Sequence, residues 1–407
     1  MEHLNTFTRK NWKDFLCFDV FFTLFIFTLP FANAYMYPFI ALSFIYFIVE
    51  KKYKQISFKQ NWPLISFGSL LVLLYLQGVF YQTLLEDFRL HSKLFLIFFL
   101  LLFTLSYGWR GNGKLGEKAF VLGVCVSILI STTSILIFWI QHQNLPLSSG
   151  SQVNQLLAIN RPYLGIFVVT SLFIFLKNIR LKLWSKKLYL VALIMLSFLI
   201  FISARLAILL SLFVVSIHFI NLFKQNKKKL VLFLLGSLGV ISVSIFNPIM
   251  LKRFKIDDGF KIDLERTLDF EPRYVIYPCN YDIFKKGIPF FGFSGEKELQ
   301  SKLNHCYTEN IEKEGKLAYF IREEFHTHNA FVNITFQGGW IALLLFTFIT
   351  TYPFFGKKYT YETKLMLFLV VCFLMVENVM HTKHGSTFFG LFAMFYFPNI
   401  QKKIRNT

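Results

Sequence analysis

Residues 188–223 read LYLVALIMLSFLIFISARLAILLSLFVVSIHFINLF, and Arg205 is the single Lys, Arg, Asp or Glu among them. An apolar run of about 20 residues is long enough to cross a bilayer as an α-helix. This stretch therefore predicts two membrane spans, 188–204 and 206–223, which are joined by a very tight turn at Arg205. Because lipid offers no partners to backbone polar groups, a helix is the simplest structure that can span there.

Similar apolar runs recur along the chain and predict an all-α polytopic membrane protein with about 12 transmembrane helices. The expected spans are 14–34, 35–50, 62–80, 92–107, 119–140, 160–176, 188–204, 206–223, 230–247, 330–353, 365–380 and 386–399. The tripeptide Ala32-Asn33-Ala34 imitates a signal-peptide cleavage site, but Asp14 and Asp19 interrupt the apolar region before it. We therefore expect the first span to be retained.

The composition agrees with this fold class. Of the 407 residues, 55% are hydrophobic and 16% are charged, and the mean hydropathy is +0.51. Soluble domains have about 25% charged residues, and a chain this apolar must bury its surface, which excludes an intrinsically disordered protein. The net charge of +20 alone would suggest a nucleic-acid partner. The hydropathy argues against such a soluble binder, so we expect no nucleic acid as a partner.

The positive charges instead report the orientation of the chain. If the N-terminus is cytoplasmic, 25 of the 43 Lys and Arg residues fall in cytoplasmic segments, and 5 fall in the short external connections. The other 13 lie in the long segment 248–329, and long translocated segments do not follow the positive-inside rule. We therefore expect both termini in the cytoplasm.

The segment 248–329 differs in kind from the rest of the chain, because its 14 acidic and 13 basic residues nearly cancel. A length of about 80 residues is enough for a small domain. We expect three regions: 1–247 with spans one to nine, 248–329 as a periplasmic loop domain that carries part of the active site, and 330–407 with spans ten to twelve and a cytoplasmic tail. In the loop, the sequence predicts a helical or interfacial segment from Arg273 that stops at Gly287 and Pro289, and a charged helix over 309–324.

Two of the five cysteines, Cys279 and Cys306, lie in this loop segment. An oxidising periplasm would allow them to form a disulfide. Two unpaired thiols are the alternative, and the spacing does not decide between them.

Ionisable groups at the external ends of spans are the candidates for chemistry, because burial of charge in a membrane is costly and is usually kept for function. Arg205 and Arg161 lie in short external connections that hold few other basic residues. A snorkelling interfacial arginine is the alternative for both. Arg273 is one of many basic residues in its loop and would be unremarkable alone.

Two polar clusters contain histidine. His326 and His328 lie where the loop meets the tenth span, and a neutral histidine in a polar cavity suits proton transfer near pH 7. Zinc is the alternative, but an H-T-H pair with no evident third ligand is a weak metal signal. Glu377, followed by His381 and His384, forms the second cluster, for which helix packing or capping is the alternative.

Several common catalytic motifs are missing from the sequence. We find no Walker P-loop, no G-x-S-x-G elbow and no H-E-x-x-H motif. The first external connection also lacks the acidic pair with which many glycosyltransferases bind a metal. A metal-independent enzyme would instead need arginines to neutralise a phosphate leaving group, so we expect no cofactor.

Three stretches carry a resemblance to a known family. They are Ser203-Ala-Arg205-Leu-Ala, Pro272-Arg273-Tyr-Val-Ile-Tyr with the downstream Lys286-Gly-Ile-Pro-Phe-Phe-Gly292-Phe, and His326-Thr-His328-Asn329-Ala-Phe with Gly338-Gly339-Trp. In order and spacing, they resemble the O-antigen ligase and O-antigen polymerase superfamily of bacterial membrane glycosyltransferases. Two positions depart from the family pattern: Gly292-Phe-Ser-Gly295 replaces a tight Gly-x-Gly, and Ala342 stands where glycine is more usual.

The resemblance implies metal-independent transfer of a glycan from an undecaprenyl-diphosphate carrier to an acceptor at the periplasmic face of the bacterial inner membrane. The acceptor would be lipid A–core for a ligase, or a second carrier-linked repeat unit for a polymerase. By the motifs, Arg205 and Arg273 would hold the diphosphate and His328 would orient or deprotonate the acceptor. Asn329 would orient His328 or cap the next helix. Further substrate-binding candidates are Arg161, His326 and Glu377.

Membrane lipids would be the remaining partners, with the apolar helices forming a groove for the polyprenyl tail. A non-enzymatic polysaccharide flippase is the rival from another class. It would call for charged residues deep in several spans and for repeat symmetry, and we find neither in the sequence.

Overall fold

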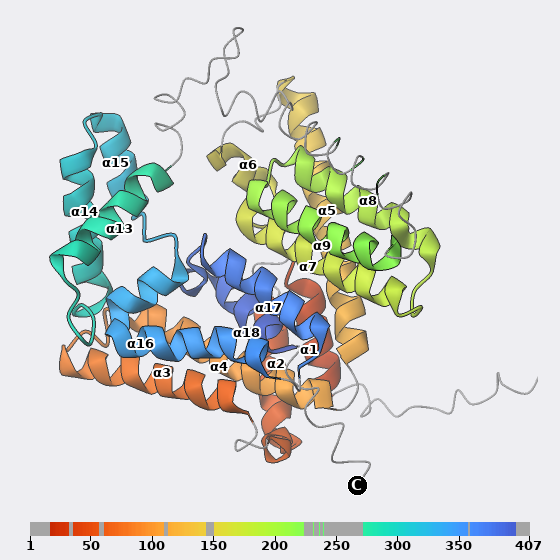
Figure 1. The fold of residues 1–407 in the computed structure, drawn as a ribbon, viewed down its shortest axis with the longest axis horizontal. Coiled ribbons are helices and arrows are strands. Elements are labelled where there is room, and N and C mark those ends of the chain that lie inside the picture. The colour runs from red at the N-terminus through yellow and green to blue at the C-terminus, as the bar shows by residue number, and fades with distance from the viewer. Residues whose placement is uncertain are drawn as a thin grey trace, which may run out of the picture.

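In a computed structural model of the protein, the described residues are 17–31, 36–56, 61–109, 113–143, 150–223, 231, 236, 239, 272–356 and 359–395. Every regular element formed by these residues is a helix, as the sequence predicts (Figure 1). The α-helices are α1 (Phe18–Thr28), α2 (Met36–Val49), α3 (Trp62–Phe80), α4 (Phe88–Trp109), α5 (Gly113–His142), α6 (Gly150–Leu156), α7 (Arg161–Arg180), α8 (Tyr189–Phe201), α9 (Arg205–Phe223), α13 (Arg273–Lys286), α14 (Gly295–Asn310), α15 (Glu314–Arg322), α16 (Ala330–Phe355), α17 (Tyr361–Leu374) and α18 (Lys383–Phe395). Short 3₁₀ turns are η2 (Lys52–Gln55), η5 (Lys186–Leu188) and η6 (Val379–His381).

Six of these helices are long and apolar enough to cross a membrane: α3, α4, α5, α7, α9 and α16. Helices α1, α2 and α8 are apolar but shorter. The protein is therefore a multi-pass membrane protein. The expected span 230–247 lies largely outside the described residues, and α17 and α18 have 14 and 13 residues. The number of twelve spans consequently stays a prediction.

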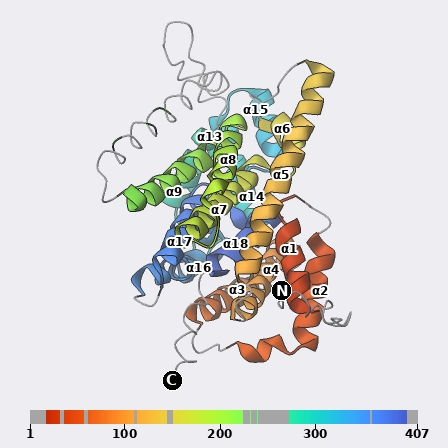
Figure 2. The same ribbon diagram turned by 90° about the vertical axis from the view of Figure 1, so that its right-hand side faces the viewer.

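The membrane helices pack around α7, which is almost entirely buried and contacts α5, α8, α9 and α17. On the other side of the molecule, α3 lies against α16, and α4 lies against α18 (Figure 1). Helix α5 extends along much of the molecule's height (Figure 2). The peripheral helices expose aliphatic side chains such as Leu122, Leu190 and Leu209, as a lipid-facing surface requires.

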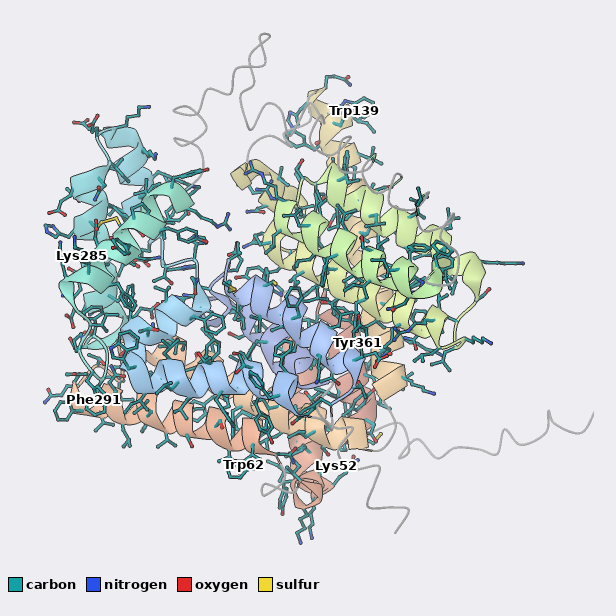
Figure 3. The ribbon with its side chains drawn as sticks, in the orientation of Figure 1. Lys52, Trp62, Trp139, Lys285, Phe291 and Tyr361 are labelled. Carbon is teal, nitrogen blue, oxygen red and sulfur yellow. A yellow bond between two sulfur atoms is a disulfide. The ribbon has the colours of Figure 1, made fainter. Side chains whose placement is uncertain are left out.

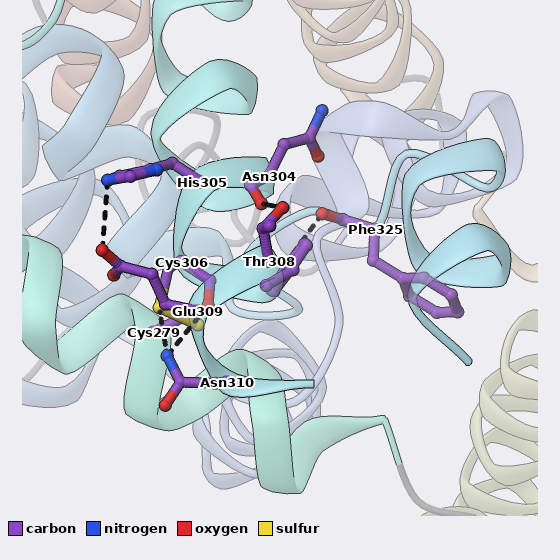
Figure 4. The surroundings of a disulfide bond; sticks show 9 residues. Cys279, Asn304, His305, Cys306, Thr308, Glu309, Asn310 and Phe325 are labelled. Atoms are coloured by element: carbon purple, nitrogen blue, oxygen red, sulfur yellow. Dashed lines mark hydrogen bonds and ion pairs between the residues drawn. A yellow bond between two sulfur atoms is a disulfide. The ribbon is translucent and has the colours of Figure 1, made fainter. Parts of the chain in front are cut away.

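Helices α13, α14 and α15 form a unit with a hydrophobic core of its own, which we call the α13–α15 unit (Figure 1). Cys279 of α13 and Cys306 of α14 form a disulfide in the middle of this core (Figure 4). The structure thus decides between the two alternatives that the sequence leaves open. Helix α13 ends before Gly287, as expected.

The prediction of one helix over 309–324 is wrong. The chain forms α14 up to Asn310 and starts α15 at Glu314, with an extended backbone at Ile311. The reason is apolar burial, since Ile311 and Phe320 both enter the core of the unit and the Phe320 ring lies 5.2 Å from that of Tyr307. A straight helix would keep these side chains from reaching the same core.

The expected tenth span, 330–353, is also not a single straight helix. Gly339 inside α16 has φ 70° and ψ −164°, which kinks the helix. A Cβ at Gly339 would lie 1.9 Å from the carbonyl oxygen of Phe290. The loop after α13 fits into this kink, where Phe293 N–H donates to the carbonyl oxygen of Phe336 at 2.7 Å. The Gly338-Gly339 motif therefore lets the loop after α13 pack directly against α16, and this contact attaches the α13–α15 unit to the helix.

Candidate functional site

Two arginines stand at the N-termini of the long helices α7 and α9. Arg161 is the first residue of α7 and Arg205 is the first residue of α9, directly after a turn in which Ser203 has φ 53°. The two helices start at the same end of the molecule and pack closely, because a Cβ at Gly165 would lie 2.8 Å from that of Ala207. Helix N-termini attract anions through their free N–H groups and their dipoles. The sequence thus places two guanidinium groups where the backbone already favours negative charge.

These two arginines line a cavity of about 280 Å³ that we call the polar pocket. The pocket is also lined by Arg273 of α13 and by Glu377, which follows α17. The remaining wall includes Ser203 and apolar residues of α9 and α17. The pocket therefore unites four of the seven site residues predicted from the sequence, and they come from four separate parts of the chain.

Glu377 links Arg273 to His328. One carboxylate oxygen of Glu377 accepts a hydrogen bond from Arg273 Nη2 at 2.6 Å, and the other lies 3.6 Å from His328 Nδ1. The Glu377 side chain is 8% exposed, whereas Arg273 and His328 are 31% and 19% exposed. This largely buried carboxylate is therefore hydrogen-bonded to Arg273 and lies within ion-pair distance of His328. If Nδ1–H of His328 points to Glu377, its Nε2 is left as an acceptor.

The backbone around His328 is held in an uncommon conformation. His328 has φ 48°, in the left-handed region that a non-glycine residue seldom adopts. The carbonyl oxygen of the preceding Thr327 accepts a hydrogen bond from Asn280 of α13 at 2.9 Å. Such strain persists where surrounding contacts enforce it, and it is concentrated at functional sites.

Asn329 caps α16, which is one of the two roles predicted from the sequence. Its Oδ1 accepts from the N–H groups of Phe331 and Val332 at 2.9 and 3.1 Å, and its Nδ2 donates to the carbonyl oxygen of Met375 at 3.0 Å. The cap therefore fixes the start of α16 and ties it to the segment that carries Glu377. Asn329 acts on the backbone next to His328, and the described contacts do not join it to the histidine ring.

His326 does not line the polar pocket. Its ring contacts those of His328 and His381 in a tilted arrangement, with centroid distances of 4.6 and 4.9 Å. Its Nδ1 accepts from the backbone N–H of His328 at 3.3 Å. Burial lowers the pKa of His326 well below its usual range, and the nearby His381, His328 and Lys93 lower the pKa further. His326 is thus neutral near pH 7, and its ring packs against that of His328.

Glu296 contacts the histidine cluster through His381, and this residue was not predicted from the sequence. Its carboxylate lies 3.0 Å from His381 Nδ1, and its backbone N–H donates to Asp87 at 2.8 Å. In the sequence, Glu296 is one of 14 acidic residues in a charged loop, and nothing in its spacing distinguishes it. Among the described residues, no three His, Cys, Asp or Glu side chains are grouped so that they could hold a metal ion.

One comparison with known proteins finds a match to part of the chain. Residues 190–347 match the family model described as O-Antigen ligase. These residues belong to the O-antigen ligase family. No curated protein and no solved structure matches the chain.

The O-antigen ligase match runs from α8 into α16. It includes Arg205, Arg273, His326, His328 and Asn329, whereas Arg161 and Glu377 lie outside the matched residues. The polar pocket is therefore built from both parts: the matched region supplies Arg205 and Arg273, and the flanking segments supply Arg161 and Glu377.

Proposed function

We propose that the protein is an O-antigen ligase-type glycosyltransferase that moves a glycan from undecaprenyl diphosphate to lipid A–core without a metal ion. The observation that supports the proposal most is the polar pocket, which is lined by three arginines and by Glu377, whose carboxylate also lies 3.6 Å from His328 Nδ1. Fixed cations that face a departing phosphate stabilise the charge that develops in the transition state. The family match supports the same class of reaction.

The proposed reaction is a displacement at the anomeric carbon of the donor. The hydroxyl oxygen of the acceptor bonds to that carbon, the bond to the diphosphate oxygen breaks, and undecaprenyl diphosphate leaves with the electron pair. Arg205 and Arg273 would neutralise the leaving group, and Arg161 would add to the positive potential of the pocket. The hydroxyl proton would pass to Nε2 of His328, whose other nitrogen faces Glu377.

We further propose that the pocket opens to the periplasm and that both termini are cytoplasmic. The charge bias of the short loops supports this orientation. The Cys279–Cys306 disulfide supports it independently, because disulfides form and persist in oxidising compartments. In this orientation the α13–α15 unit belongs to the periplasmic loop domain of 248–329, between the membrane regions 1–247 and 330–407.

The proposal predicts that Arg205→Ala and His328→Ala each reduce transfer by about 100-fold or more, because each removes a group that acts on the transition state. The assay uses purified protein, the carrier-linked glycan and lipid A–core, with EDTA in place of divalent metal. Lys182→Ala is the matched control, since it removes an exposed cation that follows the end of α7 remote from Arg161. If both site variants keep full transfer, the site assignment is wrong, and a strict need for divalent metal contradicts the mechanism.

The nature of the acceptor separates the ligase from a polymerase of the same superfamily. A strain that lacks the protein should lose all O-chains from lipid A–core if the protein is a ligase. Lipid A–core that still carries single repeat units would instead identify a polymerase. Loss of the O-chains, together with carrier-linked glycan that stays on the cytoplasmic face, would identify a flippase.

A further inference from the structure

One face of helix α13 is an exposed row of aromatic side chains. Tyr274, Tyr277, Tyr281 and Phe284 are 55%, 41%, 68% and 39% exposed. They are spaced by three or four residues, which places them on one side of the helix. The residues of the opposite side are Ile276, Cys279 and Ile283, which are buried in the core of the unit. We call the exposed row the aromatic track.

The aromatic track continues the face that carries Arg273. Tyr277 lies one turn from Arg273, and Phe284 lies three turns from it, because 11 residues are close to three times the helical repeat of about 3.6. From Tyr274 to Phe284, the track extends roughly 15 Å along the helix axis. At its far end, the Phe284 ring meets Trp340 of α16 at 5.4 Å, and Trp340 is itself 40% exposed. The track therefore leads from the polar pocket to a tryptophan at the kink of α16.

We propose that the aromatic track binds the sugar rings of the carrier-linked glycan while its diphosphate occupies the polar pocket. This inference rests on the proposed function, because it places the diphosphate beside Arg273. A glycan attached to that diphosphate has to leave the pocket along an adjacent surface, and the track begins at the next residue. Its length suits several consecutive sugar rings.

The chemistry of the track favours sugars over lipid. A sugar ring presents C–H groups on its face and hydroxyl groups at its edge, and a tyrosine offers a flat apolar ring together with one hydroxyl that donates and accepts. The surfaces that suit lipid on this protein are aliphatic, as on α8 with Leu190, Leu193 and Ile194. The track is instead flanked by Asp282 and Lys285 of the same helix, and burying such charges in hydrocarbon would be costly.

The test compares two double variants of the track. Tyr277→Phe/Tyr281→Phe keeps the flat rings, and Tyr277→Leu/Tyr281→Leu keeps the apolar character but removes them. Binding of neutral glucose and N-acetylglucosamine oligomers of one to five sugars is measured on the purified full-length protein by saturation-transfer NMR. Tyr361→Leu is the matched control, since Tyr361 is 49% exposed and lies far from α13 at the start of α17 (Figure 3).

We expect the Leu variant to bind the longer oligomers at least tenfold more weakly than the wild type. The Phe variant should stay within about threefold of the wild type, because stacking needs the ring more than the hydroxyl. Equal binding by all three proteins overturns the proposal. A wild-type protein that binds none of the oligomers overturns it as well.

A second measurement keeps this inference separate from the proposed function. In the transfer assay, the loss caused by the Leu variant should grow with the number of sugars on the donor, whereas the loss caused by Arg205→Ala should not. Suppose that Arg205→Ala leaves transfer unchanged while the Leu variant loses oligomer binding. The proposed function is then contradicted, and the binding of sugars by the aromatic track is supported. A loss in the Leu variant that is the same for every donor length overturns the track.

Discussion

The two walls of the polar pocket differ in how they hold their charged groups. On the helix wall, Arg161 and Arg205 begin α7 and α9, two membrane helices that pack closely on each other. On the loop wall, Arg273 and Glu377 line the pocket, and His328 lies beside Glu377. A disulfide ties α13 to α14, and Asn329 caps the kinked helix α16 next to His328. One wall is a product of helix packing, whereas the other depends on a set of specific links.

Under the proposed function, this difference separates two chemical tasks. The helix wall supplies positive charge and two helix N-termini, which suit a diphosphate. The loop wall combines an arginine, a carboxylate and an imidazole, which suits the transfer of a proton beside a neutralised leaving group. We therefore expect damage to the loop wall to alter positioning, and the following three predictions test that expectation from the largest effect to the smallest.

The first prediction concerns the disulfide that anchors α13. Cys279 and Cys306 are 27 residues apart, and closing a loop of this length removes chain entropy worth about 3.5 kcal/mol from the unfolded state. Cys279→Ala/Cys306→Ala should therefore lower the stability of the α13–α15 unit by about this amount. Limited proteolysis in urea, followed by mass spectrometry, would report opening of the unit.

The control for this prediction is Cys125→Ala, which removes a free thiol from α5. Addition of a reductant should destabilise the wild type and the control equally and leave the double variant unchanged. Equal protease resistance of the double variant and the wild type would show that the core of the unit holds α13 without the covalent link.

The second prediction breaks the loop wall at its centre. Glu377→Gln removes the charge that Arg273 and His328 share, and we expect transfer to fall by about 10- to 100-fold, which is part of what a well-placed general base supplies. Glu377→Asp keeps the charge on a shorter side chain and should recover part of the rate. Steady-state kinetics with varied acceptor would test whether the loss lies mainly in kcat, as a positioning role requires.

The matched control is Glu323→Gln, which neutralises an exposed carboxylate that pairs with Arg322 at the end of α15. This control should keep wild-type kinetics. If Glu377→Gln matches it, the contacts of Glu377 serve helix packing, which is the alternative that the sequence left open.

The sequence predicted the helix wall better than the loop wall. The tight turn at Arg205 follows directly from the apolar run 188–223, because a single charged residue divides two helices. The kink at Gly339 and the division of 309–324 into α14 and α15 could not be predicted, since both depend on contacts with distant residues, namely Phe290 and the core around Tyr307. The partner of Arg273 was missed for the same reason, as Glu377 lies 104 residues away. The sequence motifs identified most of the site residues, whereas the contact between Arg273 and Glu377 depends on the fold.

The third prediction concerns the neutral His326 behind the loop wall. Its pKa in the folded protein lies well below the usual value because of burial and neighbouring positive groups. Near pH 6 the unfolded chain therefore binds a proton that the folded protein does not, so stability falls as the pH drops below about 6.5 and is level above it. For one such histidine the loss at pH 5.5 is about 1.4 kcal/mol.

His326→Asn should remove this part of the pH dependence, because an asparagine oxygen can still accept from the His328 N–H but takes up no proton. Thermal unfolding of the two proteins between pH 8 and pH 5.5 would then diverge only on the acidic side, with the variant losing less stability. His305→Asn is the matched control, since His305 is exposed on α14 beside Glu309, and its curve should follow the wild type throughout. Parallel curves for His326→Asn and the wild type would mean that water reaches His326 in the folded protein, and the loop wall would then be a solvated surface instead of a fixed support for His328.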